Sequence, residues 1–259
     1  MKSQLRSVVL MLIATAACAA LAQTSALPLG TPGPATSAPA TGAPAVIGAE
    51  VNGKVTLVRA DSGAIGKDAS QVVVWLVPIG GTRLVLPGHP GVYRMVQHNK
   101  KFEPNLLVVP LDSVVDFPNF DPWFHNVFSL YRGKRFDLGL YEAGKAKQVR
   151  FDHLGASYIF CNIHPEMTAV VLTVDSDFTA ISAKNGDYTI PNVPPGGYRL
   201  HVWYENANSR DLIVLERSVV IDDGVNHVPP TVIPVIVAST GHKNKYGKDY
   251  DPQVAQPDY

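Results

Sequence analysis

The chain has 259 residues, of which 46% are hydrophobic and 17% charged, and its 22 basic residues balance 22 acidic residues. Without the first 22 residues, which hold two basic and no acidic residues, 20 basic residues face 22 acidic ones, a net charge of −2. Neither this balance nor the spacing of the basic residues gives the clustered basic face that nucleic acids require, so we expect no nucleic-acid partner.

Residues 1–22 have the pattern of a signal peptide. Lys2 and Arg6 form a basic start, residues 8–21 are mostly apolar, and Ala20 and Ala22 form an A-x-A cleavage site. We therefore expect a periplasmic or otherwise exported protein. The apolar run is shorter than the roughly 20 residues that a membrane span needs, which favours cleavage of the leader over its retention as an anchor. No membrane span is therefore expected after leader removal. A retained anchor and lipid attachment at Cys18 are the alternatives.

Residues 23–45 are rich in Pro and Ala, with Ser, Thr and Gly between them. Such a segment buries too little apolar surface to offset its chain entropy, which predicts a disordered linker or solvated tail. The last residues, 239–259, are polar and predict an irregular, frayed terminus, with a docking segment as the alternative.

From residue 46 onward, short β-prone runs alternate with Gly, Pro, Asn and Asp, and no amphipathic helix stands out. The runs are 54–58, 71–77, 105–109, 113–117, 147–151, 158–160, 169–174, 187–190, 198–203, 212–215 and 232–236. This pattern predicts an all-β protein made of β-sandwiches. About 214 residues are too many for one small sandwich, so two domains are expected.

Three potential metal ligands follow the run 158–160 at the spacing Cys-x2-His-x2-Met: Cys161, His164 and Met167. A thiolate, two imidazoles and a weak axial thioether form a blue-copper site, which cycles between Cu(II) and Cu(I). His125, 36 residues upstream, is the candidate for the second imidazole. Because the other cysteine, Cys18, lies in the leader, Cys161 has no partner for an internal disulfide.

Asn126, beside His125, is expected to support the site by a hydrogen bond from its side chain to the Cys161 loop. Each residue also has an ordinary explanation: Cys161 and Met167 as core residues, His125 as a satisfied core histidine, Asn126 as a turn residue. Only the combination, in this order and spacing, indicates copper.

Other chemistries fit less well. Structural zinc usually takes four Cys or His ligands, and three converge in this pattern. Six further histidines show no paired spacing: His89, His98, His153, His201, His227 and His242. Multicopper oxidases need His-x-His pairs, and a binuclear purple copper centre needs a second Cys in the loop. No nucleophile motif such as Gly-x-Ser-x-Gly occurs, so we expect no enzyme activity.

Residues 93–176 resemble a cupredoxin, and the Cys-x2-His-x2-Met loop with Pro165 after the histidine is similar to that of amicyanin. The resemblance implies a Greek-key β-sandwich that binds copper. Residues 46–92 and 177–238, with a Gly-x-Tyr strand at Gly186 and a Pro-Gly-Gly-Tyr turn ending at Tyr198, resemble a carboxypeptidase regulatory-like, transthyretin-type sandwich. We interpret the copper module as inserted into this second sandwich, with a serial arrangement as the alternative.

Taken together, the chain resembles exported copper proteins of methylamine utilisation. The function expected first is electron transfer, with the edge of His164 as the exit and Trp123, Phe124 and Pro165 as an apolar rim. The partner would be a redox protein, a dehydrogenase or a cytochrome, in transient contact. Copper carriage or storage, and a docking module of a larger redox complex, are the alternative functions.

Overall fold

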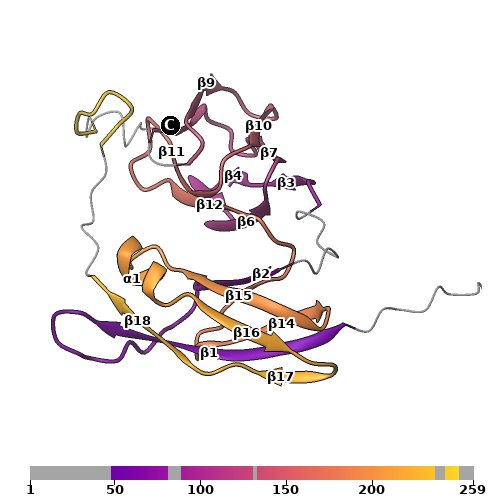
Figure 1. Ribbon diagram of the computed structural model, residues 1–259. Coiled ribbons are helices and arrows are strands. Elements are labelled where there is room, and N and C mark those ends of the chain that lie inside the picture. Colours follow the sequence, from indigo (N-terminus) through magenta and orange to yellow (C-terminus); the bar gives the residue numbers. More distant parts are fainter. Residues whose placement is uncertain (1–47, 81–88, 131–132, 237–242, 251–259) are drawn as a thin grey trace, which may run out of the picture. The chain divides into compact units, whose positions relative to one another are not determined.

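The computed structural model describes residues 48–80, 89–130, 133–236 and 243–250, which belong to one compact unit. The predicted signal peptide, the Pro-rich segment and the final nine residues lie outside the described residues. The regular structure of the described residues is almost entirely β, as Figure 1 shows, which confirms the all-β prediction. No helix in these ranges is long and apolar enough to cross a membrane.

The strands, in chain order, are β1 (Ala49–Arg59), β2 (Val73–Pro78), β3 (Val92–Arg94), β4 (Val96–His98), β5 (Lys101–Glu103), β6 (Leu106–Pro110), β7 (Ser113–Pro118), β8 (His125–Ser129), β9 (Phe136–Tyr141), β10 (Ala146–Phe151), β11 (Gly155–Phe160), β12 (Thr168–Val174), β13 (Thr179–Ile181), β14 (Asp187–Val193), β15 (Gly196–Trp203), β16 (Arg217–Ile221), β17 (Val225–His227) and β18 (Thr231–Val235). One helix, α1 (Ser209–Val214), lies between β15 and β16.

One pair of sheets is built from the first two strands and the last six strands of the described residues. The first has the order β14-β1-β17, and β18 also pairs with β1; the second has the order β13-β2-β15-β16. The long strand β1 pairs with β17 at its start and with β18 at its end, as can be followed in Figure 1. Alternate residues of these strands, such as Val51, Leu76 and Leu200, share one hydrophobic core.

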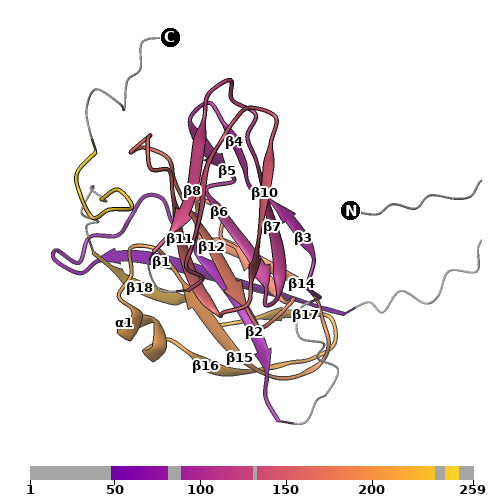
Figure 2. The ribbon, with the colours of Figure 1, turned by 90° about the horizontal axis from the view of Figure 1, so that it is seen from above.

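The residues between β2 and β13 form separate sheets. A five-stranded sheet has the order β6-β12-β11-β8-β9, and a three-stranded sheet has the order β10-β7-β3 (Figure 2). Both contribute to a second core, which includes Phe117 and Phe151 from the small sheet and Ile159 and Val171 from the large one. The strands β4 and β5 form a hairpin of their own. The chain thus leaves the first pair of sheets after β2 and returns to it at β13.

The predicted strand at residues 212–215 is wrong. Residues 209–214 are helical, and Asn208 caps the helix by accepting a hydrogen bond from the Arg210 N–H at 2.9 Å. A run of four apolar residues fits a strand and a single helical turn equally well, because periodicity needs a longer window to show itself. The N-cap residue Asn208 was the available signal for the helix.

Candidate metal centre

The loop between β11 and β12 carries three of the predicted ligands. Cys161 directly follows β11, and the antiparallel pair Phe160–Thr168 closes the base of the loop. The Cys161 N–H donates to the Met167 carbonyl at 3.2 Å, and the Met167 N–H donates to the His164 carbonyl at 3.1 Å. These bonds fold the loop into a tight turn, which brings the side chains of Cys161 and His164 together.

His125 reaches the loop from the neighbouring strand β8, which it begins. β8 and β11 pair at Phe128 and Phe160, so the start of β8 lies beside the loop that follows β11. The side chains of His125 and Cys161 have no exposed surface, and His164 is 2% exposed. The fold therefore brings two sequence-distant segments together in a buried site.

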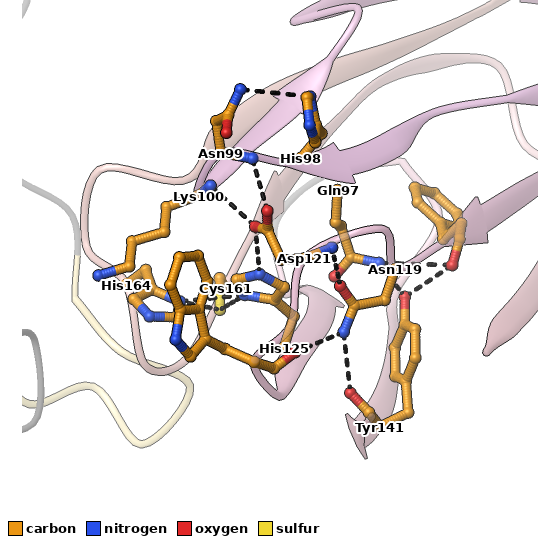
Figure 3. Close-up of polar contacts among 12 residues, drawn as sticks. Gln97, His98, Asn99, Lys100, Asn119, Asp121, His125, Tyr141, Cys161 and His164 are labelled. Atoms are coloured by element: carbon orange, nitrogen blue, oxygen red, sulfur yellow. Dashed lines mark hydrogen bonds and ion pairs between the residues drawn. The ribbon is translucent and has the colours of Figure 1, made fainter. Parts of the chain in front are cut away.

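The three donor atoms form a compact triangle (Figure 3). His125 Nδ1 lies 3.1 Å from His164 Nδ1, and Cys161 Sγ lies 3.9 Å and 3.7 Å from these two nitrogens. The point equidistant from three atoms at these separations is about 2.1 Å from each, which matches metal bonds to His nitrogen, about 2.0–2.1 Å, and is slightly shorter than metal bonds to Cys sulfur, about 2.3 Å. Within the described residues, this trio is the one group of three or more His, Cys, Asp or Glu residues close enough to hold a metal. The donor set therefore fits a soft or borderline metal ion such as copper.

Burial lowers the pKa of both imidazoles and so favours the neutral form that binds a metal. It lowers the pKa of His164 to about 4, with a further contribution from the nearby His125. It also lowers the pKa of His125, although Asp121 opposes the shift. Both rings are therefore neutral at pH 7, the state in which imidazole offers a lone pair to a metal.

Cys161 shows the opposite direction of shift for the same reason. Burial raises the pKa of its thiol, while the backbone N–H groups of Asn126, Ile163 and His164 favour the thiolate. In the absence of a cation the thiol form is stable, and metal binding must displace its proton. The three N–H groups then remain as donors around the sulfur, where hydrogen bonding tunes a copper–thiolate site.

Asp121 orients the imidazole of His125 through a hydrogen bond to Nε2, the ring nitrogen that does not face Cys161 and His164. Its Oδ2 lies 2.8 Å from His125 Nε2, and its carboxylate also accepts from the N–H groups of Asn99 at 2.7 Å and Lys100 at 2.9 Å. Although burial alone favours the neutral acid, these donors and His125 lower the pKa of Asp121. The ionised carboxylate keeps the proton of His125 on Nε2, so Nδ1 directs its lone pair at the centre of the triangle.

A second layer of polar groups fixes Asp121. Asn119 accepts from the Asp121 N–H at 3.0 Å and donates to the carbonyls of Trp123 at 2.7 Å and Tyr141 at 3.3 Å. The Tyr141 hydroxyl donates to the Phe117 carbonyl at 2.9 Å and accepts from Gln97. Figure 3 shows Asn119, Gln97 and Tyr141 on the side of His125 away from Cys161 and His164. Sequence reasoning assigned no role to Asp121, Asn119, Tyr141 or Gln97; the signal that could have found Asp121 is its place four residues before His125.

Asn126 lies at the site but makes a different contact from the one expected. Its side-chain nitrogen donates to Asp137 Oδ1 at 2.8 Å rather than to the Cys161 loop. Its backbone N–H is the part that faces the Cys161 sulfur. The residue therefore links β8 to β9 through its side chain and reaches the predicted ligand through its backbone.

Met167 and the predicted rim residues differ in their surroundings. Met167 is fully buried in the same core cluster as Cys161. Of the predicted rim residues, Phe124 is 56% exposed, whereas Trp123 and Pro165 are half-buried; His164 itself is buried. Lys100 lies over the Trp123 ring, 5.0 Å from its centroid. Its positive charge also acts to lower the pKa values of both histidines.

No known family model and no curated protein matches the chain. Among solved structures, it is similar in part to the Cu-containing nitrite reductase NirK from Thermus scotoductus SA-01, with 19% identity and a TM-score of 0.31 over 38% of this chain and 25% of that one. It is also similar to a purple cupredoxin from Nitrosopumilus maritimus, with 20% identity and a TM-score of 0.29 over 32% of this chain and 99% of that one. A mutant of amicyanin in its Cu(I) form gives 20% identity and a TM-score of 0.31 over 32% of this chain and 83% of that one. The chain thus spans a quarter of the nitrite reductase.

Proposed function

We propose that this chain is an exported blue copper protein that carries single electrons between redox partners. The observation that supports this function is the buried triangle of His125 Nδ1, His164 Nδ1 and Cys161 Sγ, whose sides are 3.1, 3.7 and 3.9 Å. Two imidazoles and one thiolate tolerate both oxidation states of copper. We further propose Met167, buried beside them, as the weak axial ligand.

Bound copper would supply a one-electron couple. The residues of the chain hold the geometry around it: Asp121 fixes the tautomer of His125, and the closed loop fixes Cys161 relative to His164. A site that cannot rearrange between oxidation states minimises the reorganisation that accompanies each electron, and burial keeps water out. Such a device transfers electrons and performs no bond chemistry, which is why we propose a carrier and not an enzyme.

We place the exit for the electron at His164, reached past the exposed ring of Phe124, which is 56% accessible. The partner would be a dehydrogenase or a cytochrome in transient contact. The sheets that flank the site in sequence, which we interpret as a transthyretin-type sandwich, would carry the copper module as an inserted domain.

The first test is a visible and electron paramagnetic resonance spectrum of the copper-loaded chain without residues 1–22. We expect an intense thiolate-to-Cu(II) band and a narrow hyperfine splitting, both abolished in Cys161→Ser and unchanged in His153→Ala, which removes an exposed imidazole on Asp152. A reversible one-electron couple with copper retained supports a carrier of electrons. Loss of copper on reduction would point instead to copper carriage, and a colourless Cu(II) protein would contradict the copper site altogether.

A further inference from the structure

The C-terminal segment, residues 243–250, contacts the loop that carries Cys161. The Tyr250 hydroxyl donates to the Cys161 carbonyl at 2.8 Å, and the Lys245 N–H donates to the Asn162 side chain at 3.1 Å. These contacts join residues 89 and 83 positions apart in sequence. This part of the tail is irregular, as expected, and its contacts favour the docking segment over the frayed terminus.

The same segment is also tied to the strand that supports His125. The Lys245 ammonium group lies 2.8 Å from Asp137 Oδ2, and the other oxygen of that carboxylate accepts from Asn126 at 2.8 Å. The pair is partly shielded, since the side chains of Lys245 and Asp137 are 22% and 37% exposed. The segment is therefore connected to both stretches of chain that bring in the predicted ligands: directly to the loop after β11, and through Asp137 to β8.

Residues 243–250 have an internal scaffold that presents these donors. Asn244 accepts from the N–H groups of Tyr246 at 2.9 Å and Lys248 at 3.1 Å, and its own N–H donates to the Lys248 carbonyl at 2.8 Å. Gly247, whose φ is +73°, permits the turn. A turn closed in this way holds Lys245 and Tyr250 in place at a lower entropic cost than an open tail would.

We propose that Lys245 and Tyr250 are positioning residues for Cys161, and that residues 243–250 act as a clip on the ligand loop. The inference rests on the proposed function. Inside the loop, the Cys161 N–H is bonded to the Met167 carbonyl at 3.2 Å; outside it, the Cys161 carbonyl is bonded to Tyr250. Fixing both sides of the residue fixes the direction of its side chain. The Tyr250 hydroxyl directs the positive end of its dipole at the Cys161 carbonyl, and the Lys245 ammonium group neutralises the Asp137 carboxylate. Both effects favour Cu(I), the less positive of the two copper states.

The first test needs no copper. Cys161 is the one cysteine of residues 23–259, so the rate at which an alkylating reagent modifies the metal-free protein reports on the freedom of this loop. We expect Tyr250→Phe to raise the rate about threefold to tenfold, the range that loss of one hydrogen bond allows. A chain ending at residue 242 should react faster still. The matched control is Tyr198→Phe, which removes a tyrosine hydroxyl that donates to the Pro194 carbonyl at 2.7 Å in the other core, and its rate should equal that of the wild type.

The second test measures the reduction potential of the copper-loaded protein. Tyr250→Phe and Lys245→Gln should both shift it to lower values, while Tyr198→Phe leaves it unchanged. Moderate salt should have little effect on the wild type, in which the Lys245–Asp137 pair is neutral and partly shielded. It should raise the potential of Lys245→Gln, in which it screens the unpaired Asp137 carboxylate.

Equal alkylation rates in the wild type, Tyr250→Phe and a correctly folded chain ending at residue 242 would overturn the clip. If the shortened chain does not fold, the alkylation rate and potential of Tyr250→Phe decide the matter. The two proposals fail separately: a wild type without the blue band refutes the copper site, whereas unchanged thiol reactivity in the metal-free variants refutes the clip.

Discussion

The contact between Asp121 and His125 decides how the candidate site is oriented. The carboxylate lies 2.8 Å from Nε2, and both side chains are buried. A buried carboxylate is stable only when its acceptors are satisfied, and here two backbone N–H groups and the imidazole satisfy them. The imidazole is thereby aimed, with its Nδ1 toward Cys161 and His164.

Replacing this carboxylate should weaken the site without dismantling it. In Asp121→Asn we expect copper affinity to fall about 10-fold to 100-fold, because the partner that orients a metal-binding His and raises its basicity is lost. The less basic imidazole should also favour Cu(I), which raises the reduction potential. Competition with a copper chelator and voltammetry measure the two effects. Asp112→Asn, which removes a carboxylate paired with Arg150 on an exposed surface, is the control.

The buried histidines also predict how the stability of the metal-free protein depends on pH. The folded-state pKa of His164 is about 4, below its ordinary value of 6.5, and that of His125 moves in the same direction. As the pH falls from 6.5 toward 4, protons therefore bind the unfolded chain first, and the folded state loses stability. For His164 the loss amounts to about 3 kcal/mol at most.

Urea unfolding of the metal-free protein at pH 7.5, 5.5 and 4.5 measures this effect. The free energy of unfolding should fall across the series, and the fall should be smaller in His164→Gln, which has no titrating group at this position. A free energy that falls equally in the two proteins across the three pH values would show that His164 is not held neutral by its surroundings.

At the scale of elements, the hairpin of β4 and β5 supports the site from outside the ligand sequence. Its two-residue turn, Asn99 and Lys100, has φ values of +52° and +53°, the conformation of a type I′ turn. This geometry points both backbone N–H groups at the Asp121 carboxylate. The turn at Asn99 and Lys100 thus positions the Asp121 carboxylate, and that carboxylate positions His125.

Two substitutions at Lys100 separate the turn from the charge. Lys100→Pro removes the N–H that Asp121 accepts and cannot adopt a positive φ, so we expect a loss of about 3 kcal/mol or more and weaker copper binding. Lys100→Gly keeps the N–H and suits the turn, since Asn-Gly is the preferred type I′ sequence, and should raise the stability by up to about 1 kcal/mol. Thermal unfolding measures both. Equal stability of the two variants would contradict this role for the turn.

The parts of the site that are local in sequence could be predicted, and the parts that depend on tertiary contacts could not. Cys161 and His164 share one turn, so ligand type and spacing were sufficient to bring them together. The carboxylate at Asp121 is also near His125 in sequence, but an Asp before a Pro is common in turns and gives no sign of its burial. The contacts of Tyr250 and Lys245 with the loop span more than 80 residues and have no local signature.

The fold shows the same division. Long alternating or apolar runs such as β1, β12 and β15 were predicted, because their length separates strand from helix. Three-residue strands such as β3 and β13 were missed, and the short helix α1 was taken for a strand, since so few residues show no period. Which strands pair with which was available only as a resemblance, because pairing depends on contacts between distant residues.

At the scale of the molecule, two strands belong to two cores at once. Ala169 and Val171 of β12 lie in the core that contains Cys161, whereas Val170, Leu172 and Val174 lie in a third cluster with Val73 of β2. Neighbours of Val73 in β2, Val74 and Leu76, belong to the core of the outer pair of sheets. Because side chains of a strand alternate between its faces, β12 and β2 each contribute to the shared cluster with one face and to their own core with the other.

This arrangement predicts that adjacent residues of β12 have separable effects. Leu172 is 2% exposed and Val171 is fully buried. Leu172→Ala should reduce the free energy of unfolding by about 2–5 kcal/mol through the cavity that it leaves in the shared cluster. It should leave the energy and intensity of the copper band unchanged, because its side chain lies on the face of β12 away from Cys161. Val171→Ala should also destabilise the protein, and because Val171 packs in the same core as Cys161 it should shift the band or broaden the resonance signal. Urea unfolding and the two spectra of each variant measure these effects. A shift of the copper band in Leu172→Ala as large as that in Val171→Ala would contradict the division, because it would mean that the shared cluster and the core around Cys161 respond as one.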